Sequence, residues 1–289
     1  MAIGEDDSLT VDLGLRRLNS ALLTATNLEL TISDEDGGAE GAAAVLPWRT
    51  LDKVAKKQRF GAWECYGDGD APDKIEGISE LTSRTASLMP TEGRHTPPTA
   101  VLAGFNMHRT KQVHPGEDTE RKLSALGRAR GRVLDVCTGT RSTRSSTTRS
   151  PSRCFLDLAL FGSSHPSGLG YTSIGAARMP TVTEVVTIEL DTLMVQLQRA
   201  NPWSADLFDN PKIQRLLGDA TEVLPALPER YFDCIVHDPP ANALSGELYS
   251  LEFYQQASRA LQLLLQTVST RCLRLLAWRY SHGFGMPMT

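Results

Sequence analysis

Four acidic residues in the second half of the sequence each follow a short apolar run: Asp135, Glu189, Asp219 and Asp238. If these runs are parallel strands, their carboxyl ends meet at one edge of a sheet, which is where such sheets bind nucleotides. Carboxylates at that edge accept hydrogen bonds from hydroxyl and amino groups of a ligand. The four acids therefore predict a nucleotide-type site. The alternative, most readily for Asp219, is that each acid only caps the helix that follows it.

The first acid lies in the motif VLDVCTG, residues 133–139. A hydrophobic strand that ends in an acid and then a glycine is typical of Rossmann-like nucleotide sites. The glycine lets the backbone approach the ligand closely, and the N-terminus of the following helix favours a ligand carboxylate. The motif therefore predicts that this turn borders the ligand.

The other acids lie in the motifs VVTIE, LGDA and CIVHDPP, at residues 185–189, 217–220 and 234–240. In folds of this type, an acid in the position of Glu189 accepts hydrogen bonds from the two ribose hydroxyls. Asp219 is placed to meet an adenine amino group. Asp238 is the candidate for the reacting end, because a carboxylate there can hold or deprotonate an amine. His237 is a second candidate base, and its alternative is a purely structural role.

Strands and helices alternate in this half of the chain. Strands are expected at residues 132–137, 184–188, 213–217 and 232–237. Helices are expected from Asp118 to a stop at Gly127, after the caps Asp191 and Asp219, and over residues 252–266. This alternation predicts an α/β fold with a doubly wound, Rossmann-like, mostly parallel sheet over residues 114–289.

Residues 1–113 predict a small α+β domain in front of that sheet. Alternating apolar residues indicate a strand at 28–32, and a helix is expected at 50–57. Further strands are expected at 62–66 and 99–105. The stretch between the last two is rich in Gly, Pro, Ser and Thr and is expected to form loops.

Several longer motifs resemble class I S-adenosylmethionine (SAM)-dependent methyltransferases of the group described as spermine-synthase-like. They are NMHRTK at 106–111, HPGEDTERKLSALG at 114–127, VLDVCTG at 133–139, GLGYTSI at 168–174, residues 201–211, and HDPPANALSGELYSLEFY at 237–254. VDLGL at 11–15 adds a weaker match. The resemblance covers most of the chain, and it implies a class I methyltransferase fold with SAM as the cofactor.

The resemblance also implies roles for particular residues. The predicted cofactor-binding residues are Asp135, Gly139 and Gly170 at the methionine end, Glu189 at the ribose, and Asp219 with Ala220 at the adenine. The predicted catalytic residues are Asp238 and His237. The predicted substrate contacts are His108, Arg109 and Tyr249, and no metal site is predicted.

The expected reaction is methyl transfer from SAM to an unidentified acceptor, with nitrogen as the favoured nucleophile. The sequence Asp-Pro-Pro at 238–240 resembles a motif of amino-methyltransferases, but Ala241 stands where an aromatic residue is usual. The first alternative is an aminopropyltransferase that uses decarboxylated SAM, because residues 246–254 resemble polyamine synthases. The second is an inactive remnant of the family.

Two segments depart from the family pattern. Residues 140–168 separate Gly139 from Leu169, which are adjacent in the family motif, and this segment includes a low-complexity Arg/Ser/Thr tract. One interpretation is inserted sequence from a retained intron or a gene-model error, and the alternative is a regulated loop. Residues 266–289 lack the expected final turn and strands, which predicts a sheet with an uncovered edge at its fourth or fifth strand.

Composition limits the remaining choices. The formal net charge of −4 lacks the positive field that drives nonspecific nucleic-acid binding. The five cysteines form no CxxC pair, so neither a zinc knuckle nor a disulfide framework is indicated. No signal peptide or membrane span is expected, and the predicted location is the cytoplasm. The predicted partner is a small-molecule or macromolecular methyl acceptor.

Overall fold

The computed structural model describes residues 10–11, 16–23, 27–32, 43–57, 61–64, 72–92, 95–108, 110, 113–127, 129–136, 156–157, 168–238 and 246–261. The chain divides into two compact units. The first unit holds residues 1–121, 168–171 and 191–209, and the second holds residues 122–167, 172–190 and 210–289. The domain boundary expected between residues 113 and 114 stays a prediction.

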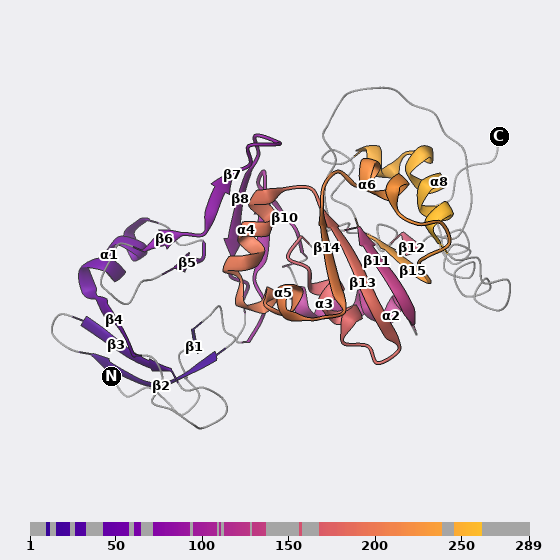
Figure 1. Cartoon of the computed structure of the whole chain (residues 1–289). Helices are drawn as coiled ribbons and strands as arrows, with labels where there is room; N and C mark the ends of the chain where they lie inside the picture. Colours follow the sequence, from indigo (N-terminus) through magenta and orange to yellow (C-terminus); the bar gives the residue numbers. More distant parts are fainter. Residues whose placement is uncertain are drawn as a thin grey trace, which may run out of the picture. The chain divides into compact units, whose positions relative to one another are not determined.

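The second unit is built on a five-stranded parallel sheet of order β12-β15-β11-β13-β14 (Figure 1). Its strands are β11 (Gly131–Val136), β12 (Leu156–Asp157), β13 (Val182–Glu189), β14 (Ile213–Leu217) and β15 (Cys234–His237). After β11 the chain forms β12 at one edge of the sheet, then places β13 and β14 on the other side of β11, and finally returns to β15, which lies between β12 and β11. The strand order reverses there, and such a switch point is where open parallel sheets bind ligands.

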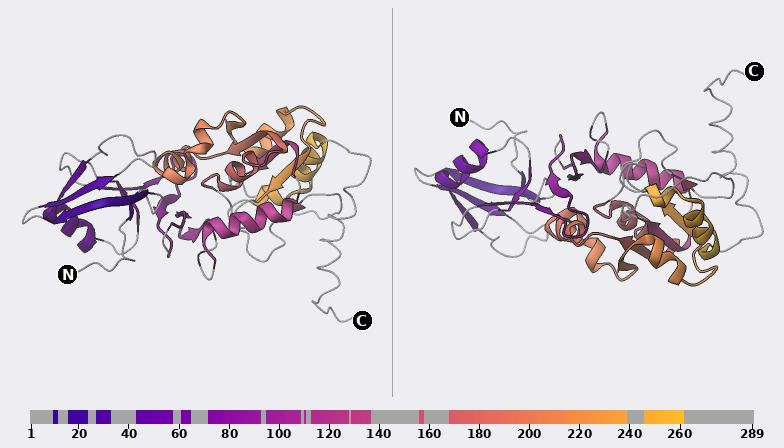
Figure 2. Two further views of the ribbon diagram at one scale, coloured as in Figure 1. Left: turned by 90° about the horizontal axis from the view of Figure 1, so that it is seen from below. Right: turned by 90° about the horizontal axis from the view of Figure 1, so that it is seen from above.

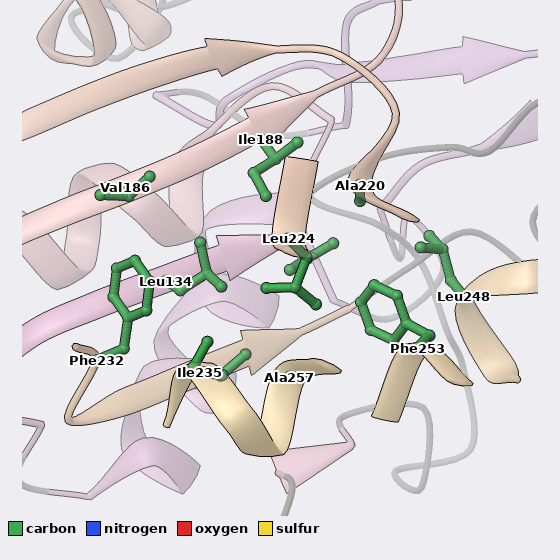
Figure 3. Close-up of a cluster of buried hydrophobic side chains, with 12 residues drawn as sticks. Leu134, Val186, Ile188, Ala220, Leu224, Phe232, Ile235, Leu248, Phe253 and Ala257 are labelled. Carbon is green, nitrogen blue, oxygen red and sulfur yellow. The ribbon is translucent and has the colours of Figure 1, made fainter. Parts of the chain in front are cut away.

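The central strands of this sheet are buried on both faces. Successive side chains along a strand point in opposite directions, so each of these strands contributes to both clusters. Val133, Val185 and Val236 pack on one face with Leu126 of α2 (Pro115–Leu126) and Ala176 of α3 (Tyr171–Ala177). The residues that follow or precede these valines in the same strands, Leu134, Val186 and Ile235, pack on the other face with α6 (Ala220–Ala226) and α8 (Leu251–Ala260), as Figure 3 shows. The expected doubly wound α/β fold is therefore confirmed.

The strand β12 comes from within residues 140–168, the segment interpreted as an insertion. Its backbone pairs in parallel with β15, with Leu156 opposite Val236 and Asp157 opposite His237. The edge that the sequence predicted beside the fourth strand is therefore occupied by β12, and β12 itself is the edge strand of the described sheet. Residues 266–289, the atypical tail, lie outside the described residues.

The first unit contains two antiparallel four-stranded sheets. One has the order β1-β2-β3-β4, and these strands can be followed in Figures 1 and 2. Its strands are β1 (Thr10–Val11), β2 (Arg16–Leu23), β3 (Asn27–Ile32) and β4 (Ala43–Pro47), and α1 (Trp48–Lys57) follows directly. The strand expected at 28–32 is confirmed as β3, and the expected helix is present as α1, which begins two residues earlier than predicted, at Trp48, so that Thr50 lies inside the helix and does not cap it.

The other sheet has the order β10-β9-β8-β7. Its strands are β7 (Glu76–Ile78), β8 (Thr85–Met89), β9 (Thr99–Leu102) and β10 (Phe105–Asn106). The single strand expected at 99–105 is wrong, because Ala103 and Gly104, with φ of 49° and 84°, turn the chain back. Two successive residues with positive φ make the tight hairpin turn whose twist suits antiparallel strands.

Shorter elements complete the two units. Within the strand expected at 62–66, the structure describes β5 (Trp63–Glu64), which pairs with β6 (Asp73–Lys74), while residues 65 and 66 lie outside the described residues. The helices α4 (Thr192–Ala200), η3 (Pro202–Ser204) and α5 (Asp206–Asp209) belong to the first unit, and η4 (Gly246–Tyr249) belongs to the second. Among the described helices, none has the length and apolar character that crossing a bilayer requires.

Candidate functional site

Asp238 directly follows β15 at the carboxyl edge of the parallel sheet, and it is only 1% exposed. Its Oδ2 lies 2.6 Å from Nζ of Lys122, a residue of α2 that is 7% exposed. Buried charges are rare unless they are paired, so each of these two residues explains the burial of the other. The strand-end acid expected at the reacting end is thus held by a lysine.

Sequence reasoning missed Lys122. The signal in the sequence was weak: Lys122 lies one helical turn before Leu126, on the face of α2 that packs against the sheet. A lysine at such a position usually extends its charged end to solvent. Only its pairing with Asp238, 116 residues away in sequence, identifies it as part of the site.

Asp135, in the motif VLDVCTG, is fully buried near the end of β11. It lies opposite Thr187 of β13 and Val236 of β15. The hydroxyl of Ser173 on α3 donates a hydrogen bond of 2.5 Å to its Oδ2. This bond anchors the first turn of α3 to the central strand. The motif's glycine, Gly139, lies outside the described residues, so its predicted role stays a prediction.

Glu189 and Asp219 lie at the ends of neighbouring strands. Glu189 is the last residue of β13, is buried, and stands opposite Leu217 at the end of β14. Its carbonyl oxygen accepts a hydrogen bond of 2.8 Å from the N–H of Gly218, which brings the turn after β14 against the end of β13. Glu189 and Asp219 therefore lie at the ends of neighbouring strands, and the predicted role of Glu189 at a ribose stays a prediction.

Asp219 also caps α6. Its Oδ1 accepts hydrogen bonds from the backbone N–H of Thr221 at 2.9 Å and from the Thr221 hydroxyl at 2.7 Å. The capping alternative is therefore confirmed for this acid, while its predicted role at an adenine stays a prediction. Ala220, the first residue of α6, is buried in the core that α6 and α8 form with the sheet, so its side chain contributes packing.

His237, the last residue of β15, is surrounded by aromatic rings. Its ring stacks on Phe253 with 5.0 Å between centroids, and meets the edges of Tyr249 and Tyr254 at 6.0 and 5.4 Å. Burial lowers the pKa of His237 from 6.5 to about 4, and a backbone interaction with Leu248 opposes this in part. The imidazole is therefore neutral at pH 7, which favours the structural alternative. Tyr249 is half-buried beside it.

His108, a predicted substrate contact, is fully buried within the first unit. Its Nδ1 lies 3.0 Å from the hydroxyl of Thr99, and its backbone N–H donates to the same oxygen. Its ring lies 5.1 Å from that of Tyr171. These contacts describe a packed position, and the predicted substrate role stays a prediction. Arg109, the other candidate of this segment, lies outside the described residues.

The turn before α3 is held within the first unit by hydrogen bonds. The carbonyl oxygens of Gly168 and Leu169 accept bonds from the side chains of Gln198 and Ser204, each at 2.8 Å. The Tyr171 hydroxyl donates to the carbonyl of Pro98 and accepts from the amide of Asn201. Burial raises the pKa of Tyr171 far above its usual value, and the bond from Asn201 opposes this in part.

Gly170 in this turn has a φ of 77°, a conformation that suits glycine. A Cβ there would lie 2.7 Å from Cδ2 of Leu207. We expect Gly170→Ala to reduce the free energy of unfolding by about 2 kcal/mol, from the left-handed backbone together with the clash. Urea denaturation measures the change. Because Leu207 is buried, Leu207→Ala costs stability by itself. The effect of Gly170→Ala in the Leu207→Ala background, relative to Leu207→Ala alone, therefore gives the backbone contribution without the clash. A Gly170→Ala protein as stable as the wild type would contradict this expectation.

Within the second unit, the structure brings Asp135, Glu189, Asp219 and Asp238 to the carboxyl ends of four adjacent parallel strands. Among the described residues, no group of three or more His, Cys, Asp or Glu side chains is arranged to hold a metal ion. The four carboxylates form a row along the edge of the sheet. Lys122 lies at one end of this row, paired with Asp238. Such a row suits a ligand with several hydroxyl and amino groups.

Comparison with known proteins shows which domains and proteins this chain is similar to. Residues 170–271 match the family model for the spermine/spermidine synthase domain. An uncharacterized protein of Methanocaldococcus jannaschii is 37% identical over 176 residues, which cover 61% of this chain and 49% of that protein. The resemblance to spermine-synthase-like proteins is therefore confirmed.

Two further relatives carry functional names. The polyamine aminopropyltransferase of Mycobacterium tuberculosis is 34% identical over 100 residues, which cover 32% of this chain and 19% of that protein. Putrescine N-methyltransferase 4 of Nicotiana tabacum is 28% identical over 99 residues, 33% of this chain and 25% of that protein. The chain thus spans about half the length of the first relative and a quarter or less of these two.

Solved structures with a similar chain course include a spermidine synthase in complex with the transition-state analogue AdoDATO. It is 16% identical, with a TM-score of 0.46, over 71% of this chain and 62% of that one. The spermidine synthase of Thermotoga maritima is 14% identical, with a TM-score of 0.44, over 71% of this chain and 61% of that one.

Proposed function

From the similarity of residues 170–271 to spermine/spermidine synthase domains, we propose that this chain is a SAM-dependent transferase that passes a methyl group to an acceptor nitrogen. The relatives named above are described as acting on amines, one by aminopropyl transfer and one by N-methylation. The observation that carries the proposal is the row of strand-end carboxylates, in which Glu189 and Asp219 stand together and Asp238 lies across the switch point.

The residues present fit an adenosyl group. Glu189 is a buried carboxylate at the end of β13, where it would accept hydrogen bonds from ribose hydroxyls. The bonds between Asp219 and Thr221 fix the carboxylate that would meet the adenine. SAM, when bound, supplies a methyl group that is already activated for transfer. The protein then has to align donor and acceptor, and alignment is a large part of the rate enhancement of such reactions.

Asp238 would act at the acceptor end, since its carboxylate lies at the end of β15 beside the central strand. It would accept a hydrogen bond from the acceptor and orient the attacking nitrogen. Aminopropyl transfer from decarboxylated SAM remains the second candidate, because residues 246–254 resemble polyamine synthases and form η4 and the start of α8 next to His237. A cytoplasmic location and the nature of the acceptor stay predictions.

Calorimetric titration with SAM tests the proposal. We expect the wild-type chain to bind SAM, and Glu189→Gln to bind it about 10–100-fold more weakly, because a charge-assisted hydrogen bond contributes about 1.5–3 kcal/mol. Glu222→Gln, the same change at an exposed position on α6, is the matched control. A folded wild-type chain that does not bind SAM would overturn the cofactor assignment. Tighter binding of decarboxylated SAM than of SAM would favour aminopropyl transfer.

The same titration on a variant that lacks residues 140–168 tests the insertion hypothesis. The deletion restores the continuous motif around Gly139 and Leu169, but it also removes β12 from the edge of the sheet. Binding only after the deletion would mean that the segment obstructs the site. Binding by both chains would favour a tolerated or regulated loop.

A further inference from the structure

A buried hydrogen bond joins α3 to the central strand of the sheet at the edge where the cofactor is expected, and this inference rests on the proposed function. The hydroxyl of Ser173 donates to Oδ2 of Asp135 over 2.5 Å, and both residues are fully buried. A hydrogen bond to a charged group is strong, and burial keeps water from competing for either partner. The contact spans 38 residues of sequence, so it depends on how α3 packs against β11.

Asp135 occupies the middle of the row of carboxylates. Glu189 and Asp219 belong to the strands on one side of β11, and Asp238 belongs to the strand on the other side. A ligand with its ribose at Glu189 and its reacting end at Asp238 has to cross the end of β11, where the methionine part of SAM would lie. Asp135 stands opposite Thr187, two residues before Glu189, so it lies deeper in the sheet than the other acids. An acid at this depth meets a ligand with one edge of its carboxylate, and the direction of that carboxylate decides whether it can accept a hydrogen bond.

The direction of the Asp135 carboxylate depends on what the side chain contacts. Rotation about the last bond of an aspartate is broad, so a fixed direction needs an outside partner. Ser173 is such a partner, and it lies on a helix that is itself held in place, because Ala176 and Ala177 pack in the core with Val133. A binding group keeps its productive geometry when the residue that orients it is locked by packing.

We propose that Ser173 is a positioning residue, whose hydrogen bond turns the Asp135 carboxylate toward the α-ammonium group of the cofactor's methionine part. In this arrangement Ser173 does not touch the cofactor. The hydroxyl holds Oδ2 of Asp135, and the ammonium group would be met by Oδ1, since an ionised carboxylate accepts hydrogen bonds at both oxygens. The effect of Ser173 on binding is therefore confined to the methionine end and does not extend to the adenosine part.

Two nucleosides that differ only in the methionine part test the proposal. S-adenosylhomocysteine is SAM without the transferred methyl group, and 5′-methylthioadenosine carries a methyl group in place of the amino-acid chain. Both are titrated calorimetrically into the wild-type chain, Ser173→Ala and Ser258→Ala, which is the same change at an exposed position of α8. We expect Ser173→Ala to bind S-adenosylhomocysteine about 10-fold more weakly and 5′-methylthioadenosine as the wild type does, because only the first carries the ammonium group. Ser258→Ala is expected to bind both as the wild type does.

A double-mutant cycle shows whether Ser173 acts through Asp135. The double variant Ser173→Ala/Asp135→Asn is expected to bind S-adenosylhomocysteine as Asp135→Asn alone does, and additive losses would overturn the proposal. An equal loss for both nucleosides in Ser173→Ala would also overturn it, because that pattern indicates a merely structural role, and so would the absence of any loss.

Circular dichroism checks the fold of each variant. If Ser173→Ala does not fold, Ser173→Cys replaces it, with a smaller expected loss, because the thiol has a similar size and is a weaker donor. A folded wild-type chain that binds neither nucleoside would overturn the proposed function, and the role of Ser173 with it. A wild-type chain that binds both, combined with any of the contrary results above, would overturn the role of Ser173 alone.

Discussion

Lys122→Met is expected to lower the free energy of unfolding by about 3–5 kcal/mol, because it leaves the carboxylate of Asp238 buried without its ammonium partner. Methionine keeps the length of the apolar stem, so the lost packing is small. Urea denaturation of the wild type and the variant at pH 7 measures the difference. An effect of this size would be a large part of the stability of an ordinary domain.

A double-mutant cycle separates the pair from its surroundings. Lys122→Met/Asp238→Asn removes both charges, and we expect it to recover most of the stability lost by the single change, since replacing both partners of a buried pair is often close to neutral. Arg121→Met, at the neighbouring exposed position with its surface pair to Glu117, is the matched control and should cost less than about 1 kcal/mol. Equal losses in the Lys122 and Arg121 variants would show that the buried pair is not important for stability.

Lowering the pH from 7 to 4 is expected to cost the protein about 3 kcal/mol through His237 alone. The folded-state pKa of about 4 lies below the unfolded value of 6.5, so the unfolded chain takes up this proton first as the pH falls. The contribution of His237 to the free energy of unfolding is therefore largely present above pH 6.5, and it is lost progressively as the pH falls to 4. Urea denaturation at several pH values across this range measures how steeply the free energy of unfolding falls with pH.

His237→Phe should remove this contribution, because phenylalanine packs among the same aromatic rings and does not titrate. The free energy of unfolding of the two proteins is compared at each pH. Other groups titrate in both proteins, so their effects cancel in the difference. The exposed His95 provides the control: His95→Phe should leave the pH dependence of the wild type in place. If the wild type and His237→Phe lost stability in parallel from pH 7 to pH 4, the ring would not be held neutral by burial.

The low pKa also bears on catalysis. A neutral imidazole at pH 7 is available to accept a proton, but a pKa near 4 makes it a poor general base, since the best catalytic groups titrate near the working pH. The ring stacked on Phe253 is therefore better suited to fixing η4 and α8 against the end of β15. Its predicted catalytic role stays a prediction, and Asp238 is the stronger candidate.

The local pattern of the sequence determined the elements of the second unit. The apolar runs that became β11, β13 and β15 could be predicted because strands buried on both faces are almost continuously apolar. In the first unit, the start of α4 could be predicted at Asp191 from an equally local signal, since its side chain accepts a hydrogen bond from the N–H of Leu193, two residues along the chain. The order of the strand-end acids followed directly.

Only the tertiary structure decided which side chains meet. Lys122 and Asp238 pair across 116 residues, and Ser173 reaches Asp135 across 38, so no local periodicity could indicate either contact. The place of β12 beside β15 is equally non-local, because a strand of two residues carries almost no pattern of its own. Local chemistry fixes backbone conformation over a few residues, whereas the partner of a buried charge depends on how distant segments pack. The sequence therefore identified the carboxylates, and the tertiary structure identified the lysine that pairs with one of them.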